Sequence, residues 1–359
     1  MRDTEKGADD LLLRTLRMLA PGTVLHEGLE NILRARTGAL IVVGDSELVM
    51  PLVNGGFKIE AETTASALYE LAKMDGAIIL TGDAKRILYA NAHLTPNPAI
   101  PAQETGIRHR TAERVARQTG ELVISISQRR NVITIYRGPL RYVMRDVGTV
   151  LAKANQALAT LERYKTVLEQ VLHNLSVLEF EDVATLQDAV TCIQRAQLVN
   201  RIAREVERYV VELGSEGRLV SMQLSELMVD VADEGILAIR DYSLDPNHKA
   251  EEIAAMLEQW SNEDLLDLSL IARAIGYGAN AGNLDTPVTP RGYRLLHKIP
   301  RLPANVIDNL VAKFRTLPEI LEASIDELDS VEGIGEIRAR NIKDGLRRLR
   351  EQVLLERQI

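Results

Sequence analysis

Short apolar runs alternate with helical patterns over the first 145 residues of the chain. The runs are rich in Val, Ile and Leu and are bounded by glycine or charged residues, as buried strands should be; they cover residues 39–43, 77–80, 122–126 and 132–136. Between them, apolar residues recur at helical spacing over residues 28–36, 65–73 and 111–118. The pattern predicts an α/β domain, residues 1–145, with a central mixed sheet covered by helices.

The pattern becomes purely helical from about residue 147. Apolar residues recur at nearly heptad spacing in a stripe that comprises Leu151, Ala154, Leu158, Leu161, Leu168, Leu172, Leu175 and Leu178. Such a stripe is typical of a helix whose apolar side is buried against neighbouring helices. We therefore expect an all-α helical spine over residues 146–285, and its simplest role is that of a structural connector.

The last block of the chain, residues 286–359, contains a weak internal repeat with an offset of 32 residues. Residues 296–303 align with residues 328–335, and Ile307 and Leu310 align with Ala339 and Ile342. Each copy has the pattern of a helix, a tight turn and a second helix. We therefore expect a third, all-α domain after the turn-rich segment 283–287.

Composition narrows the class of protein. Aromatic residues make up only 4% of the 359 residues, which agrees with a largely helical protein. The single cysteine, Cys192, excludes an internal disulfide and a Cys-rich zinc site. The first residues lack the apolar segment of a secretory signal, and no apolar run approaches the roughly 18 residues of a membrane span. We therefore expect a cytoplasmic protein without a membrane partner.

The net charge of −8 is unevenly distributed. Residues 1–145 carry 19 Lys and Arg against 16 Asp and Glu, residues 146–290 carry 11 against 24, and residues 291–359 carry 13 against 11. An acidic middle thus separates two mildly basic ends. Any role in nucleic-acid binding must therefore rest on local basic surface, because the charge of the whole chain opposes it.

Two polar triplets in the first domain carry the candidate chemistry. The first, Asp75-Gly76-Ala77, follows a helical segment and opens an apolar run. Asp75 should therefore lie on a turn at a sheet edge, where Gly76 would let a ligand approach the backbone closely. An Asp-Gly pair is also common in turns that have no function.

The second triplet, Arg108-His109-Arg110, follows Gly106 at an expected helix start. Guanidinium groups offer forked donors to phosphate oxygens, and the free N–H groups of a helix N-terminus add positive dipole character. The alternative is a solvated basic turn. Residues 127–130 end one strand and begin the next, where they could contact a phosphate or form an edge-strand charge cluster.

Together and in this order, the two triplets resemble the signature motifs of the diadenylate cyclase family. The resemblance implies that Asp75 is the catalytic carboxylate, which prepares the 3′-hydroxyl of ATP, and that the Arg108-His109-Arg110 triplet contacts the phosphates during catalysis. It also implies a nucleotide pocket formed by Gly76, Ala77, Leu94, Gly106, Ile107, Arg108, His109, Arg110, Thr111 and Ser127. Of these, Ile107 can supply only backbone contacts and apolar packing. Asp75 could accept the hydroxyl proton or hold a divalent cation, Mg²⁺ or Mn²⁺, and the sequence leaves both roles open.

Residues 331–335 and the basic helix after them resemble the helix-hairpin-helix motif, and the two repeats resemble its tandem form. The tight turn exposes backbone N–H groups that can bind a DNA phosphate without reading bases. The residues implied in DNA contact are Gly333, Ile334, Gly335, Arg338, Arg340 and Lys343. Arg301 and Pro303 take the glycine positions in the first copy, so the second hairpin should carry most of the contact. A purely structural helical hairpin is the alternative.

The chemistry implied by the resemblance dictates an assembly. Joining two ATP molecules into cyclic di-AMP, with release of two pyrophosphates, requires each 3′-hydroxyl to reach the α-phosphate of the other nucleotide. Two cyclase domains should therefore meet face to face in a symmetric homo-oligomer, and the resemblance implies an octamer. It also implies that the hairpin domain senses branched DNA, such as recombination junctions, in the cytoplasm or at the nucleoid. The alternatives are a non-enzymatic nucleotide-binding scaffold in DNA repair and a purely architectural oligomer.

Overall fold

The computed structural model describes residues 2–244, 249–278 and 282–356, and the chain divides into two compact units. The first unit runs to Asn155 and also includes Glu207–Ser221, whereas the second comprises Gln156–Val206 and the chain from Met222 onward. Three helices contribute to both units: α5 (Val147–Glu181), α6 (Leu186–Leu213) and α7 (Arg218–Met228). Within the described ranges, no helix combines the length and the hydropathy that crossing a membrane requires.

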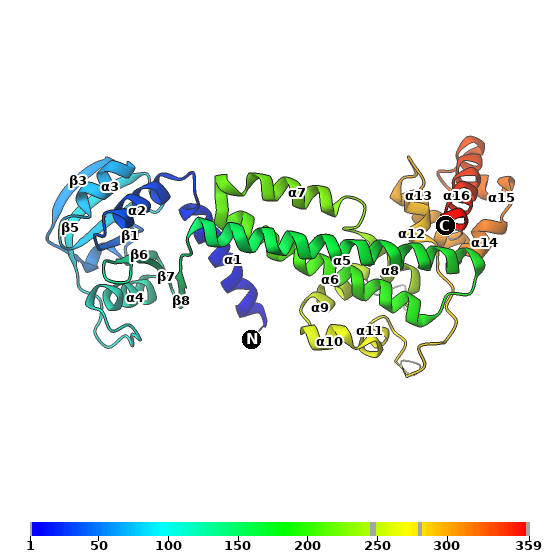
Figure 1. The fold of residues 1–359 in the computed structure, drawn as a ribbon, viewed down its shortest axis with the longest axis horizontal. Helices are drawn as coiled ribbons and strands as arrows, with labels where there is room; N and C mark the ends of the chain where they lie inside the picture. The colour runs from blue at the N-terminus through cyan, green and yellow to red at the C-terminus, as the bar shows by residue number, and fades with distance from the viewer. Residues whose placement is uncertain (1, 245–248, 279–281, 357–359) are drawn as a thin grey trace. The chain divides into compact units, whose positions relative to one another are not determined.

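The first unit is built on a mixed sheet (Figure 1). The strands lie in the order β2 (Val53–Asn54), β5 (Arg86–Leu94), β4 (Ala77–Leu80), β1 (Ala39–Val43), β6 (Leu122–Ser127), β7 (Val132–Arg137) and β8 (Leu140–Val143), and β3 (Phe57–Glu62) also pairs with β5. β1 and β4 are parallel, and the remaining pairs are antiparallel. The predicted α/β domain with a mixed sheet is confirmed.

Helices cover both faces of this sheet (Figure 1). Successive side chains of a strand point to opposite faces. Ile41 of β1 therefore packs against helices on one face of the sheet, and Val42 packs on the opposite face. The helices on the Ile41 face are α1 (Arg2–Leu19), α2 (Val24–Arg34) and α3 (Ala65–Leu71); α4 (Ile107–Thr119) lies on the other face. A short 3₁₀ helix, Met50–Leu52, precedes β2. The candidate site lies on the α4 face.

A 3₁₀ turn, Gly214–Gly217, connects α6 to α7 within the first unit, and the second unit is helical. The helices that follow α7 are α8 (Glu234–Tyr242), α9 (Ala250–Glu258), α10 (Asn262–Leu266), α11 (Leu268–Ala274), α12 (Tyr293–His297), α13 (Ala304–Phe314), α14 (Leu317–Glu322), α15 (Ile325–Asp329) and α16 (Glu336–Glu356). The predicted helical spine and C-terminal hairpin region are thus both present.

The predicted internal repeat is visible in the backbone. The hairpin of α12 and α13 recurs as that of α15 and α16, and both helix starts are displaced by the 32 residues of the sequence repeat. Arg301 in the first turn has a φ of 61° and Gly333 in the second has a φ of 84°. The two hairpins share one apolar core, in which Ile299 and Val331 are equivalent. The same turn is therefore built twice, with glycine at its left-handed position in only one copy.

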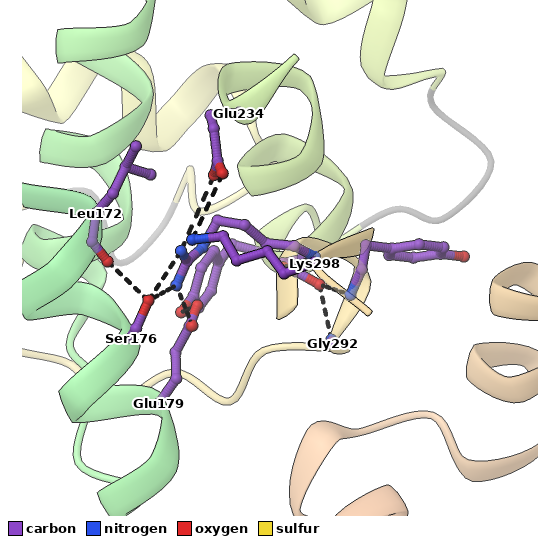
Figure 2. Close-up of polar contacts among 10 residues, drawn as sticks. Leu172, Ser176, Glu179, Glu234, Gly292 and Lys298 are labelled. Atoms are coloured by element: carbon purple, nitrogen blue, oxygen red, sulfur yellow. Dashed lines mark hydrogen bonds and ion pairs between the residues drawn. The ribbon is translucent and has the colours of Figure 1, made fainter. Parts of the chain in front are cut away.

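A cluster of buried polar groups joins the start of the hairpin region to helices α5 and α8 (Figure 2). Arg294 of α12 is fully buried and pairs with Glu179 of α5, while its Nη1 lies 3.9 Å from Oε2 of Glu234 of α8. Oγ of Ser176 lies 3.0 Å from Nη1 of Arg294. The Asp241 carboxylate accepts hydrogen bonds from the first backbone N–H groups of α12. We call Arg294, Glu179, Glu234 and Ser176 the Arg294 cluster.

Candidate functional site

A cleft of about 480 Å³ lies where β4, β5 and β6 meet the first turn of α4. The predicted nucleotide-contact residues that line it are Asp75, Gly76, Ala77, Leu94, Gly106, Ile107, Arg108, His109, Thr111 and Ser127. Arg110 is exposed and stands outside this set of lining residues. The fold therefore brings together two triplets that are separated by some thirty residues of sequence, and it leaves one of the two arginines at the margin.

The Asp75 carboxylate is fully exposed on the turn before β4. Gly76 beside it has a φ of 102°, and a Cβ there would lie 2.8 Å from the backbone carbonyl carbon of Asn91. Any other residue would have both a strained backbone and a clash with rigid main chain. Gly76 therefore lets the turn pack against β5, which presents Asp75 to the cleft.

Helix α4 begins without a capping side chain among the described residues, because its N-cap is Gly106. The N–H of Arg110 donates to the Gly106 carbonyl oxygen at 2.8 Å. Within the described part of the chain, the N–H groups of Ile107, Arg108 and His109 have no hydrogen-bond acceptor. Such a helix start favours a bound anion, and phosphate is the usual one.

Arg108 forms an ion pair with Asp75. Its Nη2 is 3.9 Å from Oδ1 of Asp75, and the Arg108 side chain is about one-third exposed. Gly38, just before β1, makes room for the guanidinium: a Cβ at this position would lie 2.1 Å from Nη1 of Arg108. Sequence reasoning missed Gly38, since a glycine at the start of a strand carries no signal for a contact with a residue seventy positions later.

His109 points its Nδ1 away from solvent, toward the hydroxyl of Tyr136 on β7 at 3.1 Å. Burial and the positive charges of Arg130, Arg108 and Arg141 lower the pKa of His109, and the nearby Glu104 only partly opposes them. His109 is therefore neutral at physiological pH, unlike the two arginines that flank it in sequence.

Several further residues line the cleft, namely Leu40, Ala92, His93, Ile126, Gln128 and Arg129. Arg129, whose role the sequence left undecided, thus faces the candidate site. Arg130 stands outside the set of lining residues, and its charge lowers the pKa of His109. Ser127 accepts a hydrogen bond on Oγ from the Arg130 backbone N–H at 3.2 Å, which fixes the turn after β6.

The carboxylate content of the cleft bears on metal binding. Asp75 is the one carboxylate among the described lining residues, and no group of three or more His, Cys, Asp and Glu side chains that could hold a metal occurs in the described ranges. Mg²⁺ is commonly bound by one or two carboxylates together with substrate phosphates and water. The residues present fit a cation that arrives with a nucleotide.

The second hairpin carries the predicted DNA-binding residues. Ile334 is buried in the hairpin core, and its N–H donates to Val331 within the turn. The N–H groups of Gly333 and Gly335 make no hydrogen bond within the part of the chain that the structure describes. These two groups are thus available to a phosphate.

The basic side chains around this turn differ in how firmly they are held. Arg338 donates to the Gly333 carbonyl oxygen and Arg340 pairs with Glu336, both at the exposed surface. Lys343 is partly buried and its Nζ donates to the Leu321 carbonyl oxygen at 2.7 Å. Arg338 and Arg340 are therefore better placed than Lys343 to meet an incoming phosphate.

Family models match the sheet domain, the helical spine and the hairpin region of this chain. The family model described as DisA bacterial checkpoint controller nucleotide-binding matches residues 26–139, its linker-region counterpart matches residues 144–284, and a SAM-like helix-hairpin-helix tandem model matches residues 293–348. The DNA integrity scanning protein DisA of Carboxydothermus hydrogenoformans is 60% identical over 345 residues, which cover 96% of this chain and 98% of that protein. The chain belongs to the DisA family.

Other members of the DisA family are almost as similar. The DisA proteins of Symbiobacterium thermophilum and Clostridium botulinum are 60% and 56% identical, over 96% and 97% of this chain and 98% of each relative. Among solved structures, a hypothetical membrane spanning protein from Bacillus cereus aligns with a TM-score of 0.31 and 22% identity, over 34% of this chain and 62% of that chain. This TM-score is too low to support any inference.

Domain boundaries in this DisA family member stay a prediction. The sequence predicts three domains, 1–145, 146–285 and 286–359. The two compact units divide the chain differently, because most of α5, from Gln156 onward, belongs with the hairpin region. The Arg294 cluster gives a physical reason for that association, since it ties α12 to α5 and α8.

Proposed function

We propose that this protein is a diadenylate cyclase, which condenses two ATP molecules into cyclic di-AMP and two pyrophosphates. The observation that carries the proposal is the cleft in which an exposed carboxylate, Asp75, lies beside the Arg108 guanidinium and the uncapped start of α4. Membership of the DisA family, with its nucleotide-binding region over residues 26–139, supports the same assignment.

The residues divide the work of adenylyl transfer. The 3′-oxygen of one ATP forms a bond to the α-phosphorus of the other, and the bond from that phosphorus to the β-phosphate bridging oxygen breaks, so pyrophosphate leaves. Asp75, exposed to the cleft, accepts the hydroxyl proton or holds a divalent cation beside the hydroxyl. Arg108 and the free N–H groups of α4 stabilise the negative charge that spreads over the α-phosphate.

We propose Mg²⁺ or Mn²⁺ as the cofactor, bound together with the triphosphate. Asp75 is the residue that would hold it. Such a cation, when bound, would supply neutralising charge to the phosphates. One carboxylate is enough for this role when phosphate oxygens and water complete the coordination.

Each chain supplies half of the reaction centre, so we propose that two cyclase domains face each other in a symmetric homo-oligomer, an octamer by analogy with the family. Two large apolar side chains flank the cleft and support this arrangement. Ile107 at the start of α4 is 78% exposed and Met74, next to Asp75, is 44% exposed. Exposed apolar side chains around a polar cleft are typical of a surface that a partner covers.

The hairpin region is proposed to bind branched DNA, such as recombination junctions, through the phosphate backbone. The free N–H groups of Gly333 and Gly335 and the exposed side chains of Arg338 and Arg340 are its contact groups. Contacts of this kind do not read bases, so affinity should fall steeply with salt.

The cyclase assignment is tested by incubating the purified full-length protein with ATP and Mg²⁺ or Mn²⁺ and separating the nucleotides by chromatography. We expect cyclic di-AMP from the wild-type protein and none above background from Asp75→Asn, because asparagine can neither take the proton nor bind the cation with a full charge. Asp83→Asn is the matched control, since Asp83 is an exposed turn aspartate in the same unit that pairs with Thr81 outside the cleft. A wild-type protein that binds ATP but forms no product would instead indicate a nucleotide-binding scaffold.

A further inference from the structure

Behind the cleft, His109 is the end of a chain of hydrogen bonds that the proposed reaction does not yet use. Its Nδ1 lies 3.1 Å from the Tyr136 hydroxyl, and this hydroxyl lies 2.9 Å from Oε1 of Glu104. Nε of Arg141, on β8, donates to the same Glu104 oxygen at 2.7 Å. Glu113 of α4 holds the Glu104 backbone in place by accepting its N–H at 3.2 Å. Residues from β7, from β8 and from the segment before α4 thus form one chain of hydrogen bonds that ends at His109.

The positions of the protons in this chain follow from its chemistry. Burial alone would raise the pKa of Glu104, but hydrogen bonds from Arg141 and Tyr136 together lower it, so Glu104 is an ionised carboxylate that can only accept. Burial and the Glu104 charge raise the pKa of Tyr136, whose hydroxyl therefore keeps its proton. The single Tyr136 proton must point to Glu104, and the hydroxyl lone pair then faces His109.

The Tyr136 hydroxyl can therefore only accept from His109, so the His109 proton lies on Nδ1. We assign this tautomer from the hydrogen-bond network. In a neutral imidazole the other nitrogen, Nε2, then carries a lone pair. Within the described residues Nε2 has no hydrogen-bond partner, and His109 lines the cleft.

We propose that Glu104 and Tyr136 are positioning residues that hold His109 as its Nδ1–H tautomer, so that an unprotonated Nε2 faces the bound nucleotide. This inference rests on the proposed function of the cleft. It assigns His109 a different task from Arg108: a lone pair cannot donate to a phosphate oxygen, so Nε2 accepts a hydrogen bond from a hydroxyl or amino group of the nucleotide. The resemblance alone had placed His109 on the phosphates together with the arginines.

A purely structural role for the same contacts makes a different prediction. The His109 and Tyr136 rings meet edge to face, with centroids 6.3 Å apart and an interplanar angle of 67°. Packing of this kind would be kept when only the hydroxyl oxygen is removed. The tautomer of His109, in contrast, would change. The proton position on the imidazole is therefore the measurement that separates the two roles.

The test uses full-length protein labelled with ¹⁵N-histidine and solid-state NMR, with the His109 signals identified by their loss in His109→Gln. In the wild-type protein we expect a protonated Nδ1 and an unprotonated Nε2. In Tyr136→Phe we expect a shift toward the Nε2–H tautomer, because Nδ1 has lost its acceptor. A wild-type His109 protonated on Nε2 would overturn the proposal, and that result does not depend on whether the variant folds.

Tyr142→Phe is the matched control. Tyr142 also donates its hydroxyl to a glutamate, Glu212 at 2.7 Å, in the same unit, and it stands outside the set of residues that line the cleft. Its variant should leave the His109 signals unchanged. Formation of cyclic di-AMP should fall about 10-fold to 100-fold in Tyr136→Phe, by analogy with metal-bound histidines that lose a supporting hydrogen bond, and stay near the wild-type rate in Tyr142→Phe.

The two measurements separate the two claims. If the wild-type protein makes no cyclic di-AMP, the cyclase assignment fails, while the NMR result still decides the tautomer. If the tautomer is as expected but Tyr136→Phe and Tyr142→Phe lose activity equally, Glu104 and Tyr136 are structural and the positioning role is wrong.

Discussion

Arginine meets carboxylate in two contrasting regions, the cleft and the Arg294 cluster. In the cleft, Nη2 of Arg108 lies 3.9 Å from Oδ1 of Asp75, and the Asp75 side chain is fully exposed. In the cluster, Arg294 and Glu179 are both buried and in direct contact, with Glu234 and Ser176 as further partners (Figure 2). The same pair of groups, a guanidinium and a carboxylate, is thus exposed to solvent in the cleft and buried away from solvent in the Arg294 cluster.

The difference separates a binding site from a structural joint. An exposed ion pair contributes little to stability and can exchange its partner for a ligand at little cost. A buried charge that loses its partner is strongly unfavourable, because the remaining charge has no water to solvate it. Arg108 can therefore turn from Asp75 to a phosphate, whereas Arg294 is committed to joining α12 to α5 and α8.

The largest expected effect is on the Arg294 cluster. Arg294→Met should lower the free energy of unfolding of the second unit by about 3–5 kcal/mol, because Glu179 stays buried without its cation and Glu234 is left with Lys298, whose Nζ lies 3.6 Å from its Oε1. Trp260 is the only tryptophan of the chain and lies in this unit, so its fluorescence during urea unfolding reports the change directly.

Arg340→Met provides the exposed counterpart in the same unit. Arg340 pairs with Glu336 one helical turn away, and both side chains are more than 60% exposed. Its loss should change the unfolding free energy by less than about 1 kcal/mol. Equal losses in the two variants would show that burial does not distinguish these pairs, and the comparison between joint and site would be wrong.

The sequence predicted the parts of the fold whose pattern is local. The four apolar runs correspond to β4, β1, β6 and β7, which are neighbours in the middle of the sheet and buried on both faces. The strands without such a run, β3 among them, lie toward the sheet edges, where solvent-facing residues such as Lys58 and Glu62 break the apolar run. An edge strand needs only one apolar face, so its signal is weaker.

The candidate site divides in the same way. Asp75 and Arg108 stand in short motifs that the sequence shows directly. The partners of buried polar residues elsewhere in the fold could not be predicted. Tyr136 is 32 residues from its partner Glu104, and Glu179 is 115 residues from its partner Arg294. No spacing rule links residues so far apart; only the folded chain brings them together. The leucine stripe on α5 predicted burial, yet nothing in it indicated that a buried cation would meet Glu179.

A smaller effect is expected at the second hairpin. Gly335→Pro should weaken binding of branched DNA about 3-fold to 10-fold, because it removes one backbone donor to a phosphate. The first hairpin already has Pro303 at the equivalent position with a φ of −68°, and a Cβ at Gly335 would meet open space. The turn should therefore survive, and basal cyclase activity should not change. Fluorescence anisotropy with a labelled four-way junction measures the affinity.

The reciprocal variant, Pro303→Gly, sharpens this result because it adds a donor to the first hairpin and should not weaken binding. Gly333→Pro is a poorer probe, since the φ of 84° at Gly333 is closed to proline and the turn itself would break. Unchanged affinity in Gly335→Pro at low and high salt would remove the Gly335 N–H from the list of DNA contacts.

The smallest expected effect is a difference in pH response between the two regions. The pKa of His109 is lowered from its ordinary value of 6.5, chiefly by burial, so the unfolded chain takes up this proton more readily than the folded one. Stability of the first unit should therefore decline as the pH falls through 6.5 toward the folded pKa, and it should decline less in His109→Gln. The second unit should respond in the opposite direction: Arg294 keeps its charge because its pKa is raised further above its ordinary range, but burial raises the pKa of the adjacent Asp241 to about 7, so acidification from pH 7 favours the folded state there. Calorimetric melting at pH 7 and pH 5.5 measures the change in stability of both units. If the His109→Gln variant loses as much stability on acidification as the wild-type protein, His109 is not desolvated in the cleft.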